Sequence, residues 1–69
     1  MKNKRFYEDI AKIFKEAREK AGLTQAEVAK KAGIHVNYYA RVERGGPEAR
    51  GDILNKIAKA LNVKIELPL

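Results

Sequence analysis

Two short segments with apolar residues at helical spacing, separated by a glycine-containing turn, constrain the fold of this chain most strongly. The first segment spans residues 25–32 and the second spans residues 36–44. Thr24 stands before the first segment as a natural N-cap, and Gly33 after it tolerates the positive φ that often follows a helix. The chain is therefore predicted to form two short helices joined by a tight turn.

The second segment has two unlike faces. Tyr39 and Val42, with Ile34 before them, form one apolar edge that we expect to be buried. The opposite face carries Val36, Asn37, Tyr38, Ala40 and Arg41. A helix of this kind, braced by the helix before it, matches a helix-turn-helix, whose second helix enters the major groove of double-stranded DNA. We therefore predict a helix-turn-helix over about residues 25–44.

Apolar residues at steps of three and four predict two further helices, one on each side of this pair. The first covers about residues 3–21. The other begins between residues 48 and 53 and ends at Asn62. A chain of 69 residues is enough for one small domain. The predicted fold is an all-α bundle of four helices followed by a short strand, all within a single domain over residues 1–69.

The predicted strand is the last segment, about residues 63–69, where apolar and polar residues alternate. Its apolar positions are Val63, Ile65 and Leu67. Nothing else in the chain has the pattern of a strand, so this one needs a partner from outside, most simply the same segment of a second copy. The alternative is an apolar tail that lies on the core.

The charge balance points to an anionic partner. Fifteen Lys and Arg against nine Asp and Glu give a net charge of +6, which steers a surface toward polyanions such as nucleic acid. A lysine-rich surface that serves only solubility would have the same composition. Charge alone therefore does not distinguish nucleic-acid binding from solubility, and the helix-turn-helix pattern must decide between them.

The composition also speaks against several functions. With no Ser, no Cys, one His and two Asp, the chain cannot assemble a catalytic triad, a thiol nucleophile or a multi-histidine metal site. It has no glycine-rich phosphate loop, and no apolar run approaches the ~20 residues that span a bilayer. No secretion signal is recognisable. We predict no enzyme, no metal, no cofactor and no membrane contact, and a cytoplasmic location.

The segment LTQAEVAKKAGIHVNYYARVERG resembles the helix-turn-helix of the lambda-repressor and Cro family, also called the XRE family. Upstream, EAREKAG is similar to the first helix of that family, and downstream DILNKIAKALNV is similar to its fourth. The resemblance covers about residues 9–63. It implies a lambda-repressor-like bundle that binds double-stranded DNA.

The resemblance implies that Val36, Asn37 and Arg41 face base edges. The chemistry agrees, because Asn pairs bidentately with adenine, Arg pairs with guanine, and Val touches a thymine methyl group. It also implies a role for Gln25, at the start of the second helix, which touches a phosphate and helps to orient the neighbouring reading residue.

Three further residues fall where members of this family commonly meet the DNA backbone: Thr24, Tyr38 and Arg44. Such contacts position a protein on DNA without reading sequence. For Tyr38, ordinary core packing is the alternative.

The family often pairs an Arg late in the first helix with a Glu late in the third, and Arg18 and Glu43 occupy those positions. We interpret them as a structural ion pair that orients the helices. Removing one partner of such a buried pair leaves the other charge unpaired, at a cost of ~3 to 5 kcal/mol. The alternative, in which Glu43 contacts a base, is less favoured on a helix that already offers Arg41.

Two residues depart from the family pattern. His35 stands at the N-cap of the reading helix, where Ser or Thr is usual, and it either serves the structure or contacts DNA. Tyr39 replaces a branched aliphatic residue, so its hydroxyl must find a partner or emerge at the edge of the core.

The sequence therefore predicts a transcriptional regulator, with repression from an inverted-repeat operator by a homodimer as its mechanism. The alternative is an antitoxin. Antitoxins of toxin–antitoxin pairs are similar in having this helix-turn-helix followed by a strand that pairs across a dimer, and they also bind a toxin protein. No toxin-binding surface is recognisable in the sequence.

Overall fold

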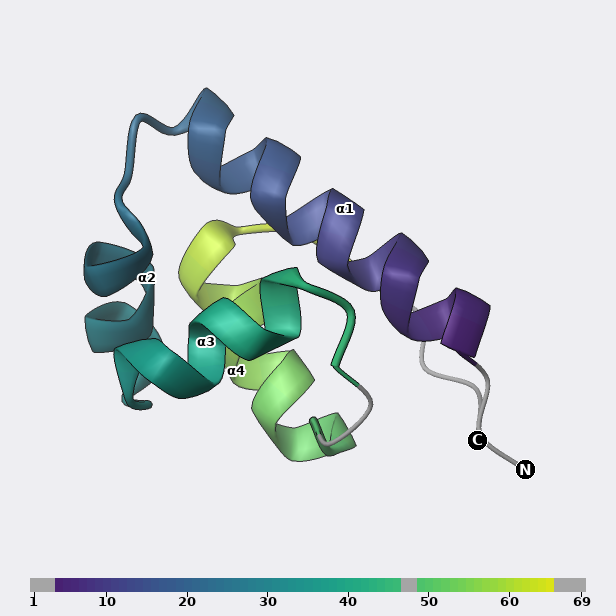
Figure 1. The fold of residues 1–69 in the computed structure, drawn as a ribbon. Coiled ribbons are helices and arrows are strands. Elements are labelled where there is room, and N and C mark those ends of the chain that lie inside the picture. The colour runs from purple at the N-terminus through teal and green to yellow at the C-terminus, as the bar shows by residue number, and fades with distance from the viewer. Residues whose placement is uncertain (1–3, 47–48, 66–69) are drawn as a thin grey trace.

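The computed structural model describes residues 4–46 and 49–65 and contains four helices in that part of the chain. They are α1 (Lys4–Lys20), α2 (Gln25–Ala32), α3 (Val36–Glu43) and α4 (Gly51–Leu61). The predicted all-α bundle is confirmed, with every helix where the apolar spacing placed it. α1 lies across the bundle, with α3 packed beneath its middle and α2 beside α3 (Figure 1). None of these helices is long and apolar enough to span a bilayer.

The four helices end in the same way. In each, an N–H group beyond the last turn donates to the carbonyl five residues earlier, which closes a Schellman motif. The residue just before that donor has a φ between 58° and 80° in all four: Gly22, Gly33, Gly45 and Asn62. The predicted positive φ at Gly33 and the predicted stop at Asn62 are therefore both confirmed.

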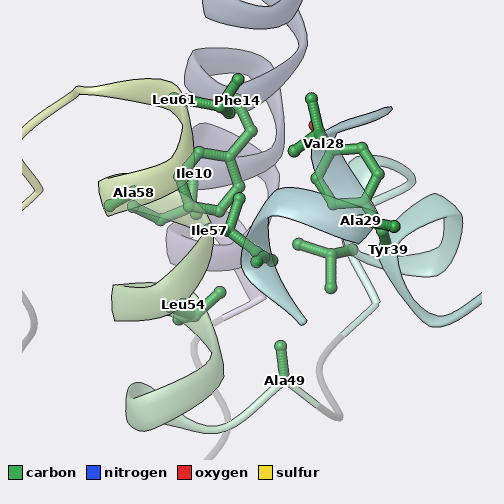
Figure 2. Close-up of a cluster of buried hydrophobic side chains, with 12 residues drawn as sticks. Ile10, Phe14, Val28, Ala29, Tyr39, Ala49, Leu54, Ile57, Ala58 and Leu61 are labelled. Carbon is green, nitrogen blue, oxygen red and sulfur yellow. The ribbon is translucent and has the colours of Figure 1, made fainter. Parts of the chain in front are cut away.

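The core lies where the four helices meet (Figure 2). Its largest fully buried side chains come from every helix: Tyr39, Phe14, Leu54, Ile57 and Val28. Each such side chain contributes about 1.5 to 3 kcal/mol relative to leaving it exposed. Ala29, which is 2% exposed, is small enough to let α2 approach its neighbours closely. Tyr39 and Val42 anchor α3 to this core, as their spacing predicted.

The predicted C-terminal strand is not formed over the residues that the structure describes. Residues 63–65 follow α4 without a strand beside them, and a strand needs a partner for its backbone groups. The N–H of Val63 instead donates to the carbonyl of Ala58 at 2.9 Å. Val63 and Ile65 pack partly buried against the core, which is the alternative given above for this segment. Leu67 lies outside the described residues.

Candidate nucleic-acid interface

The exposed face of α3 carries a row of polar side chains. Asn37, Arg41 and Arg44 are exposed and are spaced by four and three residues, so they lie along one side of the helix and its C-cap. None of these three side chains forms a hydrogen bond or ion pair with the described part of the chain. The row is therefore free to contact another molecule.

Val36 and Tyr38 lie at the edge of this row. Both side chains are half-buried and pack against the hydrophobic core. The Tyr38 hydroxyl forms no hydrogen bond with the residues described, whereas the ring is partly covered. Tyr38 and Val36 thus each combine core packing with a partly exposed surface.

The start of α2 is fixed by a capping box. Thr24 Oγ1 accepts a hydrogen bond from the Glu27 N–H at 3.1 Å, and Glu27 Oε1 accepts one from the Thr24 N–H at 2.8 Å. These two bonds satisfy backbone donors that the first turn of a helix otherwise leaves free. Thr24 is exposed and serves as the predicted N-cap.

The C-terminal end of α3 is tied to α1 by an ion pair. Arg18 Nε donates to Glu43 Oε2 at 2.6 Å, and Arg18 Nη2 donates to Glu43 Oε1 at 3.2 Å. A third nitrogen, Nη1, donates to the Leu23 carbonyl at 2.9 Å, just before α2. The Glu43 side chain is only 4% exposed and that of Arg18 15%. This bidentate pair therefore joins three segments in a largely dry environment.

Two more side chains donate to the same carboxylate. Tyr39 Oη donates to Glu43 Oε2 at 2.5 Å, one helical turn away, and Gln25 Nε2 donates to Glu43 Oε1 at 3.0 Å. With the two bonds from Arg18, each carboxylate oxygen accepts two hydrogen bonds, which fills the capacity of the group. We call these four residues, Arg18, Gln25, Tyr39 and Glu43, the Glu43 cluster.

The pKa shifts in the Glu43 cluster follow from this arrangement. Burial alone would raise the pKa of Glu43, but hydrogen bonds from Arg18, Tyr39 and Gln25 outweigh it and hold that pKa below its ordinary value. The hydrogen bond to Glu43 raises the pKa of Arg18. Burial, with the hydrogen bond to Glu43, raises the pKa of Tyr39. At neutral pH the cluster thus consists of a carboxylate, a guanidinium and a neutral phenol.

The N-terminal end of α3 is held by the imidazole of His35. This side chain is exposed, and its Nδ1 accepts a hydrogen bond from the Asn37 N–H at 3.1 Å. An accepting Nδ1 carries no proton, so the bond requires a neutral imidazole protonated at the other nitrogen. His35 therefore caps the helix despite being an uncommon residue at that position.

The sequence interpretation did not foresee the partners of Tyr39 and Gln25. A signal for the first was present, because Tyr39 and Glu43 are four residues apart and such residues share one helix face. The bond between Gln25 and Glu43 joins α2 to α3 and has no comparable local signal. The described residues hold no group of three or more side chains that could bind a metal ion.

Comparison with known proteins agrees with this geometry. The model of the helix-turn-helix family matches residues 14–67. Two proteins of Mycobacterium tuberculosis, MT0491 of strain CDC 1551 / Oshkosh and Rv0474 of strain H37Rv, are each 38% identical over 50 residues. Both are named uncharacterized HTH-type transcriptional regulators. The match covers 72% of this chain but 36% of each relative. No solved structure matches the chain significantly.

Proposed function

This chain belongs to the helix-turn-helix family, and on that premise we propose that it is a sequence-specific, double-stranded DNA-binding regulator that represses transcription. The observation that carries the proposal is the exposed row of Asn37, Arg41 and Arg44 on α3, whose side chains have no partner among the described residues. An α-helix fits the major groove, which is about 12 Å wide, and side chains on its outer side reach the base edges.

In this proposal Arg41, Asn37 and Val36 read bases. Arg41 donates two hydrogen bonds to the O6 and N7 atoms of a guanine, and Asn37 pairs with the N6 and N7 atoms of an adenine. Val36 offers the exposed part of its side chain to a thymine methyl group. Each good bidentate pair supplies about 1 to 3 kcal/mol of discrimination against the wrong base.

Thr24, Gln25, Tyr38 and Arg44 contact backbone phosphates in this proposal. Gln25 Nε2 carries two hydrogens, of which one is given to Glu43 and the other is left for a phosphate oxygen. The Glu43 cluster then fixes the direction of the second hydrogen. The cluster itself is structural, because a carboxylate that accepts four hydrogen bonds and is 4% exposed has nothing left to offer a base.

The functional unit we propose is a homodimer on an inverted repeat, with its two copies of α3 about 34 Å apart in successive major grooves. The support is the size of one half-site, since a single reading helix of eight residues contacts few base pairs. The alternating tail, with Val63, Ile65 and Leu67, would pair with its copy once Val63 and Ile65 give up their contacts with the core. Bound at a promoter, the dimer blocks access to it.

Selection of bound duplexes from a random pool tests the proposal. We expect an enriched site with two inverted half-sites, and sedimentation should show a dimer on it. Arg41→Ala should lose about 1 to 3 kcal/mol on that site and relax the preference at one base pair of each half-site. Gln25→Ala should weaken binding evenly on selected and random duplexes, as loss of a phosphate contact does.

Arg50→Ala is the matched control, because Arg50 is also an exposed arginine but lies at the N-cap of α4, where it pairs with Asp52. It should bind the selected site like the wild type. Failure to enrich any sequence would refute sequence-specific binding. A half-site bound by a monomer would refute the dimer alone.

A further inference from the structure

A basic groove lies at the edge of the helix-turn-helix, between α1 and the C-terminal end of α3. It has a volume of about 260 Å³. α1 contributes Lys12 and Lys15 to its lining, and the end of α3 contributes Arg44 and Gly45. α1 and α3 pack directly against each other here (Figure 1). A Cβ atom at Gly45 would lie 3.3 Å from Cγ of Glu8, so the turn after α3 touches α1.

The cations of this groove are not neutralised by the protein. Among the described residues, Lys12, Lys15 and Arg44 form no ion pair within 4.0 Å. Two carboxylates line the groove, but that of Glu43 is committed to the Glu43 cluster. Glu8 alone therefore faces three cations, and the groove has an excess of positive charge that favours an anion.

The groove continues the exposed row of α3. Arg44 belongs to both, because it follows Asn37 and Arg41 along one side of the helix and also lines the groove. A helix that enters the major groove of DNA is flanked by the phosphates of both strands. If Asn37 and Arg41 contact base edges, one strand of the DNA backbone should therefore pass close to the end of α3 and to α1.

We propose that Lys12 and Lys15 of α1, together with Arg44, bind backbone phosphates of the same DNA duplex that α3 reads. This inference rests on the proposed function and extends the DNA-binding surface from the helix-turn-helix to the middle of α1. The two lysines position the protein on DNA and do not read sequence, because a phosphate is the same at every base pair.

A second groove is also lined by three cations, and two of them have a different explanation. It lies between α2 and α4, is lined by Lys31, Lys56 and Lys59, and does not include any residue of α3. Lys31 and Lys59 lie in the last turns of their helices, where a positive charge offsets the helix dipole, whereas Lys56 lies in the interior of α4. Lys12 and Lys15 lie in the middle of α1, so the dipole gives no reason for them.

The test compares two double variants that remove the same charge at the same spacing. Lys12→Ala with Lys15→Ala changes the proposed phosphate site, and Lys56→Ala with Lys59→Ala changes the groove between α2 and α4. All four lysines are exposed, and alanine has a high helix propensity. Both variants should therefore have the same melting temperature as the wild type, measured by circular dichroism. Binding to the selected duplex and to a random duplex is measured by fluorescence anisotropy between 50 and 300 mM KCl, roughly the range over which counterion release is resolved.

We expect the variant of Lys12 and Lys15 to weaken binding by the same factor on both duplexes, on the order of tenfold or more at 0.1 M salt. The slope of log affinity against log salt concentration should become shallower by about 2, because each lost phosphate contact reduces the slope by about 1. The preference for the selected duplex should be unchanged. The variant of Lys56 and Lys59 should keep the wild-type slope.

Equal slopes for the wild type and the variant of Lys12 and Lys15 would overturn this inference and leave the proposed function intact. Equal losses in the two double variants would also overturn it, because they would trace the effect to net charge. A wild type with no salt-dependent binding to any duplex would instead overturn the proposed function, and this inference with it.

Discussion

The two ends of α3 are held in very different ways. At the C-terminal end, Glu43 is 4% exposed and accepts four hydrogen bonds from three residues on all three of the first helices. At the N-terminal end, the exposed imidazole of His35 accepts one hydrogen bond from the described residues, that of the Asn37 N–H. The helix is therefore oriented from its buried end, and the end that carries Val36 and Asn37, the residues proposed to read bases, is held locally.

Among the contacts at the two ends of α3, loss of Arg18 should reduce stability most. Arg18→Ala takes away both ion-pair bonds and leaves Glu43 buried without a cation. We expect a loss of about 3 kcal/mol in the free energy of unfolding, measured by urea denaturation at low temperature. Lys20→Ala, which removes an exposed cation from the same helix, should change stability by about 0.5 kcal/mol or less. Similar losses in both variants would contradict a special role for the pair.

Loss of the Tyr39 hydroxyl should have the next largest effect on stability. Tyr39→Phe keeps the buried ring and removes one of the four donors to the carboxylate, so we expect a loss of about 1.5 kcal/mol in the free energy of unfolding. Tyr38→Phe is the matched control on the adjacent position, where the hydroxyl has no partner in the described part of the chain. It should cost about 0.5 kcal/mol or less. A Tyr39→Phe variant as stable as the wild type would refute the bond.

The apolar spacing was enough to predict the helices and the buried face of α3, because burial imposes one period on every helix. It also predicted the core position of Tyr39. That a buried tyrosine hydroxyl must find a partner or emerge at the edge of the core followed from the residue type. The spacing could not predict the link between Gln25 and Glu43, since that bond depends on how α2 and α3 are placed in three dimensions. The alternation of apolar and polar residues at Val63 and Ile65 predicted a strand. The same alternation also suits a segment that packs its apolar side chains against the core of its own chain, as Val63 and Ile65 do.

Acid should weaken the buried end of α3. Because the pKa of Glu43 is lowered in the folded chain, the unfolded chain takes up a proton first as the pH falls. The stabilisation is complete above the ordinary Glu pKa of about 4.3 and is lost as the pH falls below it, by at most about 1.4 kcal/mol per pH unit. Urea denaturation between about pH 6 and pH 3 measures this loss, a range that brackets the ordinary Glu pKa.

Glu43→Gln should be less stable at neutral pH and should lose less stability on acidification, whereas Glu16→Gln, at an exposed position of α1, should follow the wild type. Identical acid profiles for the wild type and Glu43→Gln would show that other carboxylates govern the response. That result would contradict the assignment of the acid response to Glu43, but not its hydrogen bonds with Arg18 and Tyr39.

The smallest effect is expected at the other end of α3. Ser is among the strongest N-cap residues, so His35→Ser should raise the free energy of unfolding by about 0.5 kcal/mol, while His35→Ala should lower it. Thr24→Ala provides the scale, because loss of the capping box of α2 should cost about 1 kcal/mol. A His35→Ser variant less stable than the wild type would show that the imidazole does more than cap the helix.

The same His35→Ser variant separates the two interpretations of this histidine. If His35 only caps α3, the variant should bind the selected duplex as tightly as the wild type, since the helix begins at the same residue. If His35 also contacts DNA, the affinity should fall although the protein is more stable, and stability and binding would change in opposite directions. No substitution in the Glu43 cluster has this property, because there a less stable α3 and a weaker interface are expected together.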